Sequence, residues 1–460
     1  MVVGELPSEA ELAVVGGGPG GYTAAAEAAR RGVDVTLIDE GGLGGTCLHR
    51  GCIPSKALLH VADVVDGARR SADVGVDCTV DVDLAETADW SEGVVDSLAR
   101  GVEGLLESQD VDVVDGRARF VDVDAVHVEG RGRLEFERAI LATGSRPVVP
   151  PEFDVDGERV LTSDEALRPR TLPDSVVVVG GGYIGMETAT AYSKLGSDVV
   201  VLEALDTVLS AYGDRLTRYV ERRARDLGLE LRTGEAVVDC ESGGAGAIVS
   251  TESDAYDCDV VVVAVGREPV VDFDFEAAEV EVDERGHVVV DEATRTSNPA
   301  IQAVGDVAGE PMLAHVAYQE GRVAGRVAAG EDAVLDQRAV PKAVFTDPEL
   351  AVVGLGEDGA RAAGFDAVVG EHRLGANGRA MSRDDALGVV RVVVDSETGF
   401  VLGGELACNG ASELVNQLAL AIEMGATVTD VTETVFFHPS LSEAVAEATR
   451  AVEDDVGGNG

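Results

Sequence analysis

One pattern, a buried strand followed by a glycine-rich turn, a helix and a second strand, occurs twice in this chain. The first copy begins at LAVV (12–15), continues through the helical segment TAAAEAARRG, which Gly32 ends, and finishes at VDVTLI (33–38). The second copy begins at VVVV (176–179) and finishes at VVVL (199–202) after the helical segment ETATAYSKLG. Two such βαβ openings predict an α/β chain with two nucleotide-binding domains.

The first glycine turn has the spacing GxGxxG, at Gly16, Gly18 and Gly21. The first glycine permits the tight turn, the second lets the backbone approach a pyrophosphate, and the third lets helix and strand pack closely. Asp39 ends the following strand, where a carboxylate can accept hydrogen bonds from ribose hydroxyls. Because the strand, the helix, the second strand and the acid are all in place, we predict a dinucleotide-binding site rather than a purely structural turn.

The second glycine turn repeats this spacing at Gly180, Gly182 and Gly185, and Glu203 ends its following strand. A carboxylate suits a free 2′-hydroxyl and repels a 2′-phosphate, so Glu203 favours NAD over NADP. The alternative is that Glu203 is simply a solvated strand end. Two dinucleotide sites in one chain indicate electron transfer between a tightly bound flavin and an exchanging nicotinamide.

Two of the six cysteines, Cys47 and Cys52, are close in sequence and follow the first ribose-binding acid. A zinc half-site would need a second ligand pair, and no CxxC or HxxxH occurs elsewhere, so we predict no metal site. A structural disulfide would be unusual in a reducing compartment. A redox-active pair beside the first cofactor is the interpretation we favour. The other four cysteines are predicted to be small core residues, at Cys78, Cys240, Cys258 and Cys408.

The chain is strongly acidic, with 85 Asp and Glu against 36 Lys and Arg and a formal net charge of -49. Self-repulsion of this size destabilises a compact state unless salt screens it. The apolar periodicity argues against a disordered acidic chain, so we interpret the charge as adaptation to the salt-rich cytoplasm of a halophilic organism. Nucleic acid and anionic membranes are unfavourable partners. The absence of a long apolar run and of a basic start before an apolar stretch predicts a cytoplasmic protein.

The segment GGTCLHRGCIPSKALL, which begins at Gly44, resembles the redox segment of the class I flavoprotein disulfide reductases, and most of all the branch that acts on dihydrolipoamide. The resemblance covers about residues 12–448. AILATGSRP and GREP resemble the crossings between the two nucleotide-binding domains, and TSNPAIQAVGD resembles the second FAD motif. The C-terminal HPSLSE resembles the active-site segment HPTLSE of that family.

The family resemblance implies a fold of two Rossmann-like dinucleotide-binding domains plus a C-terminal α+β dimerisation domain. We expect a FAD-binding domain at 1–146, an NAD-binding domain at 147–270, a central domain completing the FAD site at 271–340, a dimerisation domain at 341–450 and a disordered tail at 451–460. It also implies a homodimer, a dihydrolipoamide or lipoyl-protein substrate, and association with a 2-oxoacid dehydrogenase complex.

Roles for individual residues follow from the resemblance in the same way. Cys47 would exchange with the substrate and Cys52 would face the flavin, in a redox-active disulfide. His438 would be the base, reaching the cysteines of the other subunit, with Glu443 orienting it. Lys56, paired with Glu187, would lie near the flavin. The implied FAD contacts are Gly16, Gly18, Gly21, Asp39, Gly45, Thr46, Lys56, Ala118, Gly144, Asp306, Ala314 and His315, and the implied NAD contacts are Gly180, Gly182, Tyr183, Gly185, Glu203 and Gly266.

Some positions depart from the family pattern. His49 and Arg50 lie between the cysteines where the family often has Asn and Val, and a cation there is expected to lower the thiol pKa. Asp347 and Phe436 replace residues that are often His. These departures leave open a related enzyme that reduces another disulfide, a metal or a quinone. A non-enzymatic subunit with a vestigial flavin is disfavoured by the retained cysteines, His438 and Lys56. For Tyr183, core packing is the alternative to covering the nicotinamide pocket.

Overall fold

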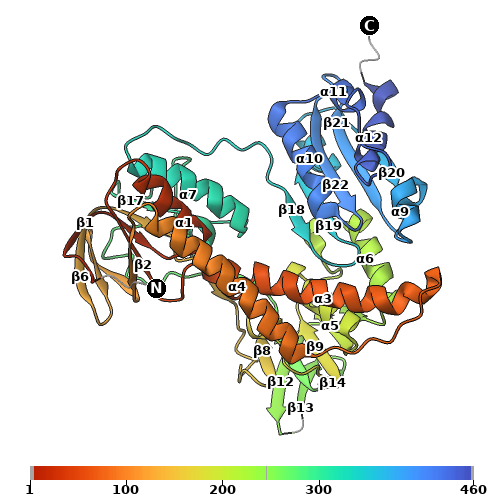
Figure 1. Cartoon of the computed structure of the whole chain (residues 1–460), viewed down its shortest axis with the longest axis horizontal. Coiled ribbons are helices and arrows are strands. Elements are labelled where there is room, and N and C mark those ends of the chain that lie inside the picture. The colour runs from red at the N-terminus through yellow and green to blue at the C-terminus, as the bar shows by residue number, and fades with distance from the viewer. Residues whose placement is uncertain (1–4, 245, 457–460) are drawn as a thin grey trace.

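The computed structural model describes residues 5–244 and 246–456 and shows three units (Figure 1). The N-terminal unit and the second unit each contain a sheet that begins with a parallel βαβ unit, and a third unit with an antiparallel sheet follows them. This arrangement agrees with the predicted α/β chain ending in an α+β unit.

The first unit is built on a sheet in the order β3-β2-β1-β6-β5-β4, in which β1 pairs with β2 and β6 in parallel. The strands β1 and β2 are almost fully buried, because helices cover one face while residues of β4 and β5 and of the segment 270–308 cover the other, and this explains their continuous apolar sequence. Its elements are β1 Glu9–Val15, α1 Pro19–Ala29, β2 Val35–Asp39, α2 Gly45–His49, α3 Cys52–Arg70, η1 Ser71–Val74, α4 Leu84–Glu107, β3 Asp112–Asp115, β4 Ala118–Asp122, β5 Ala125–Val128 and β6 Gly132–Leu141.

The second unit repeats this opening in a sheet of order β11-β10-β9-β15-β8, beside a three-stranded antiparallel sheet β12-β13-β14. The predicted strands and helix are present as β9, α5 and β10. Its elements are β8 Val160–Thr162, η2 Glu165–Leu167, β9 Ser175–Val179, α5 Tyr183–Leu195, β10 Asp198–Glu203, η3 Ser210–Tyr212, α6 Asp214–Asp226, β11 Glu230–Thr233, β12 Val237–Gly243, β13 Gly246–Thr251, β14 Ala255–Cys258 and β15 Val260–Val263.

The chain crosses between these units twice, and the two crossings pair with each other. Strand β7 (Ser145–Pro147) leads into the second unit and β16 (Arg267–Pro269) leads back, forming an antiparallel ribbon. After the return, β17 (Ile301–Ala303) joins the first sheet beside β6, and α7 (Ala314–Ala328) packs on α1 after the short helix η4 (Gly305–Val307). Segment 271–340 therefore contributes to the first unit.

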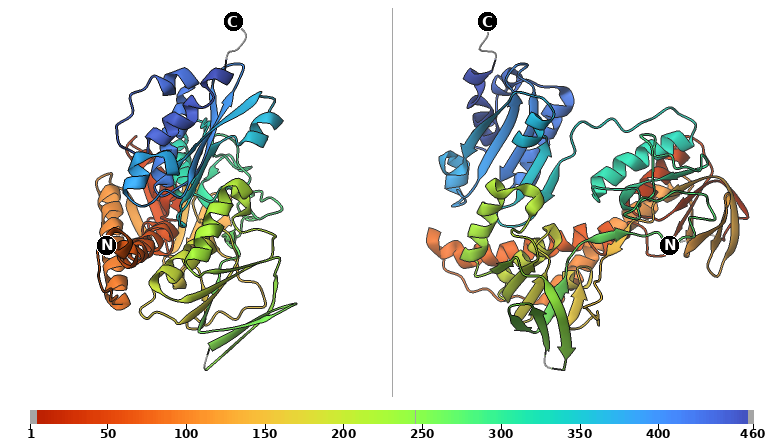
Figure 2. Two further views of the ribbon diagram at one scale, coloured as in Figure 1. Left: turned by 90° about the vertical axis from the view of Figure 1, so that its right-hand side faces the viewer. Right: turned by 180° about the vertical axis from the view of Figure 1, so that it is seen from behind.

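The third unit is a five-stranded sheet of order β18-β19-β22-β21-β20 with helices packed against it. It lies over α3 and α6 when the molecule is seen from the front and from behind (Figures 1 and 2). Its elements are β18 Lys342–Val344, β19 Leu350–Gly354, α8 Glu357–Ala362, β20 Ala367–Arg373, η5 Leu374–Ala376, α9 Gly378–Ser382, β21 Val389–Asp395, β22 Val401–Ala407, α10 Ala411–Met424, α11 Val428–Thr432, α12 Glu443–Arg450 and η6 Glu453–Asp455.

Two sequence expectations about burial need correction. The tail was expected to be disordered from 451, but Val452 is 2% exposed in the core of the third unit and η6 follows it; residues 457–460 lie outside the described part. Cys258 and Cys408 are buried as expected and Cys240 is half-buried. Cys78 is exposed, because it lies on the surface after α3, where its thiol donates to the carbonyl of Ala68.

Candidate functional site

A single cavity joins the first glycine turn to the cysteine pair and to helix α5 of the second unit. Gly18 borders it and a Cβ there would have only Gly45 Cα within 4 Å, so this glycine leaves open space beside the backbone at the start of α1. An elongated ligand with a phosphate group fits a cavity that starts at a helix N-terminus.

The acid at the end of β2 closes the first glycine turn. Asp39 accepts hydrogen bonds from the backbone N–H groups of Gly17 (2.7 Å) and Gly41 (3.0 Å). Burial raises the pKa of the Asp39 carboxyl, and the bonds from these two N–H groups oppose that shift. Gly21 is buried in α1, and a Cβ on it would lie 1.8 Å from the carbonyl oxygen of Gly16, so its role is helix–strand packing.

The second glycine turn has the same construction. Glu203, at the end of β10, accepts hydrogen bonds from the N–H groups of Gly181 (2.6 Å) and Leu205 (2.8 Å). A Cβ on Gly185 would lie 1.9 Å from the carbonyl oxygen of Gly180, which repeats the close packing in the first turn. Two segments that are far apart in the sequence thus have the same arrangement of an acid and a glycine turn. This arrangement suits an adenine ribose and a pyrophosphate.

The cysteines lie on consecutive helices at the wall of the cavity. Cys47 lies in α2 and Cys52 is the first residue of α3, which is 19 residues long. The pKa of Cys52 is lowered from an ordinary 9.0 to about 7: hydrogen bonding from Cys47 is the largest cause, burial opposes it, and the ammonium of Lys56 also contributes to the lowering. The same hydrogen bond, followed by burial, raises the pKa of Cys47. In the dithiol form Cys52 is therefore the thiolate and Cys47 the thiol.

The cation near Cys52 is held by an acid from the second unit. Lys56 Nζ lies 2.7 Å from Glu187 Oε2 and 4.3 Å from the ring centroid of Phe345. The other oxygen of Glu187 accepts the backbone N–H of Phe345 at 3.0 Å. Lys56 and Glu187 both border the cavity, so the ammonium remains next to the thiolate.

The crossing ribbon positions a further acid in the cavity. Asp306 of η4 accepts a hydrogen bond from the hydroxyl of Ser145, at the start of β7. Arg267, at the start of β16, donates to that hydroxyl and to the carbonyl oxygen of Ser145, each at 2.8 Å. Ser145, Arg267 and Asp306 all border the cavity, so the ribbon sets its shape as well as linking the units.

His438 lies away from this cavity, before α12. Its Nδ1 is 2.8 Å from Glu443 Oε1, and the other oxygen of Glu443 accepts the N–H of Ser440 at 2.8 Å. The Ser440 N–H and then His438 lower the pKa of Glu443, which keeps it ionised to orient the imidazole. The His438 side chain is 79% exposed in the single chain, and its neighbours Val435 and Phe437 are 95% and 78% exposed.

Most of the residues expected to contact FAD border the cavity. These are Gly16, Gly18, Asp39, Gly45, Thr46, Lys56, Ala118, Gly144, Asp306 and Ala314, together with both cysteines. Gly21 lies behind the turn. His315 is exposed and its ring lies 2.8 Å from the carbonyl oxygen of Pro341, so its side chain is directed away from the cavity.

The residues expected to contact NAD divide between two places. Tyr183 borders the cavity and is 41% exposed, which contradicts the core-packing alternative. Gly180, Gly182, Gly185, Glu203 and Gly266 are not part of the cavity lining. The second glycine turn therefore faces a separate region of the second unit.

Two of the four residues between the cysteines, His49 and Arg50, make contacts that the sequence did not indicate. Burial raises the pKa of Asp39 and of Asp164, and the Arg50 guanidinium opposes that rise. The ammonium of Lys56 acts to lower the pKa of both thiols. His49 Nε2 lies 2.9 Å from the carbonyl oxygen of Leu43, where it closes the loop before α2. The expectation that Arg50 lowers the thiol pKa has no support in these contacts.

A tyrosine pair near Cys47 was not foreseen. The Tyr22 hydroxyl of α1 donates to Tyr318 of α7 at 2.8 Å, and the rings meet edge to face with centroids 5.9 Å apart. Burial and then this hydrogen bond raise the pKa of Tyr22, and a charge on Cys47 acts in the same direction. The two residues are 296 positions apart, so no local sequence pattern could have joined them.

Within residues 5–244 and 246–456 no cluster of three or more His, Cys, Asp or Glu side chains is arranged to hold a metal ion. No helix in the same part of the chain is both long enough and apolar enough to cross a bilayer.

The fold and the thiol pair define a disulfide oxidoreductase that uses nucleotide cofactors. The sequence matches the pyridine nucleotide-disulphide oxidoreductase family over residues 10–321 and its dimerisation domain over residues 340–449. The chain belongs to this family.

Relatives and solved structures match over nearly the full length. Dihydrolipoyl dehydrogenase 2 of Haloarcula marismortui is 47% identical over 99% of each chain, and the dihydrolipoyl dehydrogenase of Haloferax volcanii is 48% identical over 97% of each. The crystal structure of LpdA from Mycobacterium tuberculosis superposes with a TM-score of 0.90 at 28% identity, covering 96% of this chain and 99% of that one. The flavoprotein disulfide reductase RclA of Escherichia coli gives 0.87 at 29% identity, covering 96% and 100%.

Proposed function

We infer that this protein is a dihydrolipoyl dehydrogenase, which oxidises dihydrolipoamide to lipoamide and reduces NAD⁺ to NADH. The observation that carries this conclusion is the cavity in which the dithiol Cys47–Cys52 meets a dinucleotide-binding glycine turn. The cofactors are FAD and NAD, and the protein acts as a homodimer.

The residues around the cavity fit FAD. The open space at Gly18 and the start of α1 suit its pyrophosphate, and Asp39 suits a ribose. We propose that Asp306 binds the ribityl chain and that Lys56 lies beside the isoalloxazine. When bound, FAD supplies the two-electron link between the dithiol and NAD⁺. Glu203 and the second glycine turn would hold the nicotinamide dinucleotide.

We propose different tasks for the two sulfurs, and the difference between their pKa values supports this division. In the oxidised enzyme a substrate thiolate attacks Cys47 Sγ, the S–S bond breaks, and Cys52 leaves with the electron pair. This direction is favoured because a thiol of lower pKa is the better leaving group, and the pKa of Cys52 is about 7. The second substrate thiol then attacks the mixed disulfide, which releases lipoamide and leaves Cys47 reduced.

We propose that His438 accepts the substrate's thiol proton and acts in the active site of the partner subunit. Its imidazole is oriented by Glu443 yet exposed in the single chain, beside the exposed apolar residues Val435 and Phe437. A second copy of the third unit would cover these side chains and bring His438 to the partner's cysteines. Each dimer would then have two composite active sites.

We also propose a cytoplasmic location, service in a 2-oxoacid dehydrogenase complex, and domain boundaries at 146, 270, 340 and 450. The dithiol chemistry, which needs a reducing compartment to persist, supports the location. The paired crossings at β7 and β16 support the first two boundaries.

The activity is tested in molar KCl with dihydrolipoamide and NAD⁺. We expect turnover that is lost in Cys47→Ser and Cys52→Ser, with a strong preference for NAD⁺ over NADP⁺. If lipoamide is inert while another disulfide, a metal ion or a quinone is reduced by NAD(P)H, the protein is a different reductase of the same family.

The composite site is tested with a heterodimer of Cys47→Ser and His438→Gln chains, each carrying a different tag and purified on both. Each homodimer should be inactive. The heterodimer should keep about half of the wild-type activity, because one of its two sites combines the intact cysteines with the intact histidine. An inactive heterodimer would mean that the histidine serves the cysteines of its own chain.

A further inference from the structure

Helices α3 and α5 are joined by two ion pairs of opposite polarity. Near the cavity, Lys56 of α3 pairs with Glu187 of α5 at 2.7 Å. Seven residues further along each helix, Asp63 of α3 pairs with Lys194 of α5 at 2.6 Å. Seven residues are two helical turns, about 10.5 Å, so both pairs lie on one face of each helix and form only in one relative position of the helices.

A short segment of the third unit contacts both ion pairs. Between β18 and β19, Phe345 donates its N–H to Glu187, and two residues later Asp347 lies 2.8 Å from Lys194 Nζ. The Asp347 side chain is 9% exposed and that of Lys194 is 5% exposed. All three units therefore meet on the two ion pairs.

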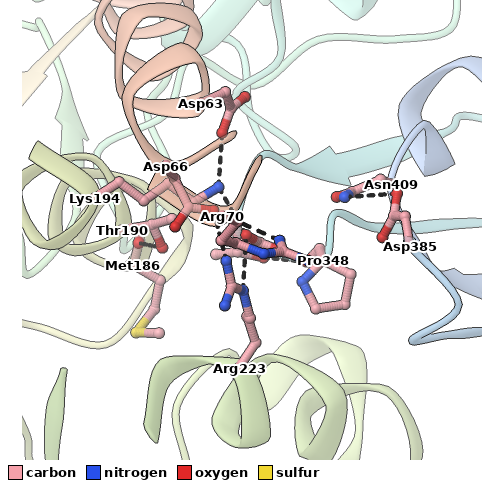
Figure 3. A network of polar contacts seen from close by, with 12 residues as sticks. Asp63, Asp66, Arg70, Met186, Thr190, Lys194, Arg223, Pro348, Asp385 and Asn409 are labelled. Atoms are coloured by element: carbon pink, nitrogen blue, oxygen red, sulfur yellow. Dashed lines mark hydrogen bonds and ion pairs between the residues drawn. The ribbon is translucent and has the colours of Figure 1, made fainter. Parts of the chain in front are cut away.

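Further charges complete the cluster around Lys194 (Figure 3). Arg223 of α6 reaches Asp347 with Nε at 3.0 Å and Asp66 of α3 with Nη2 at 2.6 Å, and Arg70 lies 3.6 Å from Asp66. Three cations thus face three carboxylates in a chain whose net charge is -49. Lys194, Asp347 and Arg223 are largely buried, whereas Asp63 and Arg70 reach the surface. Removing one of the buried members leaves an uncompensated charge, which makes the arrangement highly specific.

We propose that Lys194 is a positioning residue for the active site: through Asp63 and Asp347 it fixes α3 relative to α5 and the third unit, and thereby holds Lys56 beside Cys52. Lys194 itself does not border the cavity. Cys52 and Lys56 both lie on α3, so the effect reaches them through Glu187 of α5. The Lys194–Asp63 pair sets the position of α5 beside α3, and with it the position of the Glu187 carboxylate that holds the Lys56 ammonium. This inference rests on the proposed redox role of Cys52.

Lys194→Met tests the proposal, because methionine retains the length of the side chain and removes the charge. The chain supplies a matched control in Lys342→Met, since Lys342 is exposed at the start of β18. We expect Lys194→Met, but not Lys342→Met, to lower kcat about tenfold with little change in the KM for NAD⁺, because small displacements of reacting groups are costly. Lys194→Arg should restore part of the loss.

The second readout is the long-wavelength absorbance of the thiolate beside oxidised flavin, titrated with pH after two-electron reduction. A displaced Lys56 stabilises the Cys52 thiolate less, so the midpoint should rise in Lys194→Met. The reductant is dithionite or NADH, so the midpoint is obtained without lipoamide. If the protein does not oxidise dihydrolipoamide, the proposed substrate is wrong. The pH midpoint of the thiolate absorbance can still be compared between Lys194→Met and the wild type.

Asp63→Asn provides a variant that should fold, because the Asp63 side chain is 59% exposed. It removes one partner of Lys194 and should shift both readouts in the same direction as Lys194→Met by a smaller factor. If Lys194→Met does not fold in molar KCl, the kcat and the pH midpoint of Asp63→Asn test the proposal instead. A kcat and a midpoint equal to those of Lys342→Met in the folded variants would overturn the proposal.

Discussion

The hydrogen bond between the two thiols is the largest cause of the low pKa of Cys52, and this leads to a direct prediction. Cys47→Ala removes the donor, whereas Cys47→Ser keeps a hydroxyl in its place. Both variants leave Cys52 as a single thiol beside the flavin. We therefore expect the Cys52 pKa to be higher in the alanine variant than in the serine variant.

The size of the effect follows from the shift from 9.0 to about 7. This shift is a factor of about 100 in acid dissociation, shared between the hydrogen bond and the ammonium of Lys56 against the cost of burial. In molar salt the Debye length is about 3 Å, so part of the Lys56 effect is screened while the hydrogen bond persists. We expect the alanine variant to titrate at least about one unit above the serine variant.

The assay is a pH titration of the thiolate–flavin absorbance of the two variants in molar KCl. At pH 8 a thiol of pKa about 7 is roughly nine-tenths ionised, whereas one of pKa about 8 is roughly half ionised. The absorbance at that pH should therefore be about twofold lower in the alanine variant, and lower still if the two midpoints differ by more than about one unit. Equal midpoints for the two variants would refute the assignment of the hydrogen bond as the main cause.

Three further predictions concern the rest of the molecule. The melting temperature should rise steeply between low and molar KCl, because salt screens the net charge of -49; a melting curve indifferent to salt would contradict this. His438→Gln should lower kcat by about 10²–10⁴-fold and Glu443→Gln by less, measured with dihydrolipoamide, because Glu443 only orients the base; equal losses would assign both the same role. Burial alone would raise the pKa of Asp347, but Lys194 and Arg223 hold it below its usual value. The ionised Asp347 carboxylate therefore stabilises the fold at any pH above its pKa in the unfolded chain, and this stabilisation is lost as the pH falls through its pKa in the folded protein. Asp347→Asn should therefore lose about 3–5 kcal/mol near neutral pH and less in acid by denaturant unfolding, and a loss independent of pH would exclude this linkage.

The parts of the fold that depend on local sequence could be predicted from it. The glycine spacings, the acids Asp39 and Glu203 and the apolar strands specify two βαβ units, because turns, caps and buried strands depend on residues close together in sequence. The cysteine pair and the order of its neighbours in the chain likewise indicated a redox centre. The expected effect of Arg50 on the thiol pKa stays a prediction, because proximity in sequence does not show where a long side chain points.

Contacts between distant residues were decided by tertiary structure alone. Lys194, Asp63 and Asp347 come from three units, and nothing near any of them in sequence indicates the other two. The same holds for Tyr22 with Tyr318, and for Val452, which packs into the third unit at the end of an acidic, glycine-rich chain. The sequence determined the secondary structure and the chemistry of the site. Packing of the three units decided which charges meet, because ion pairing depends on distance in space and not along the chain.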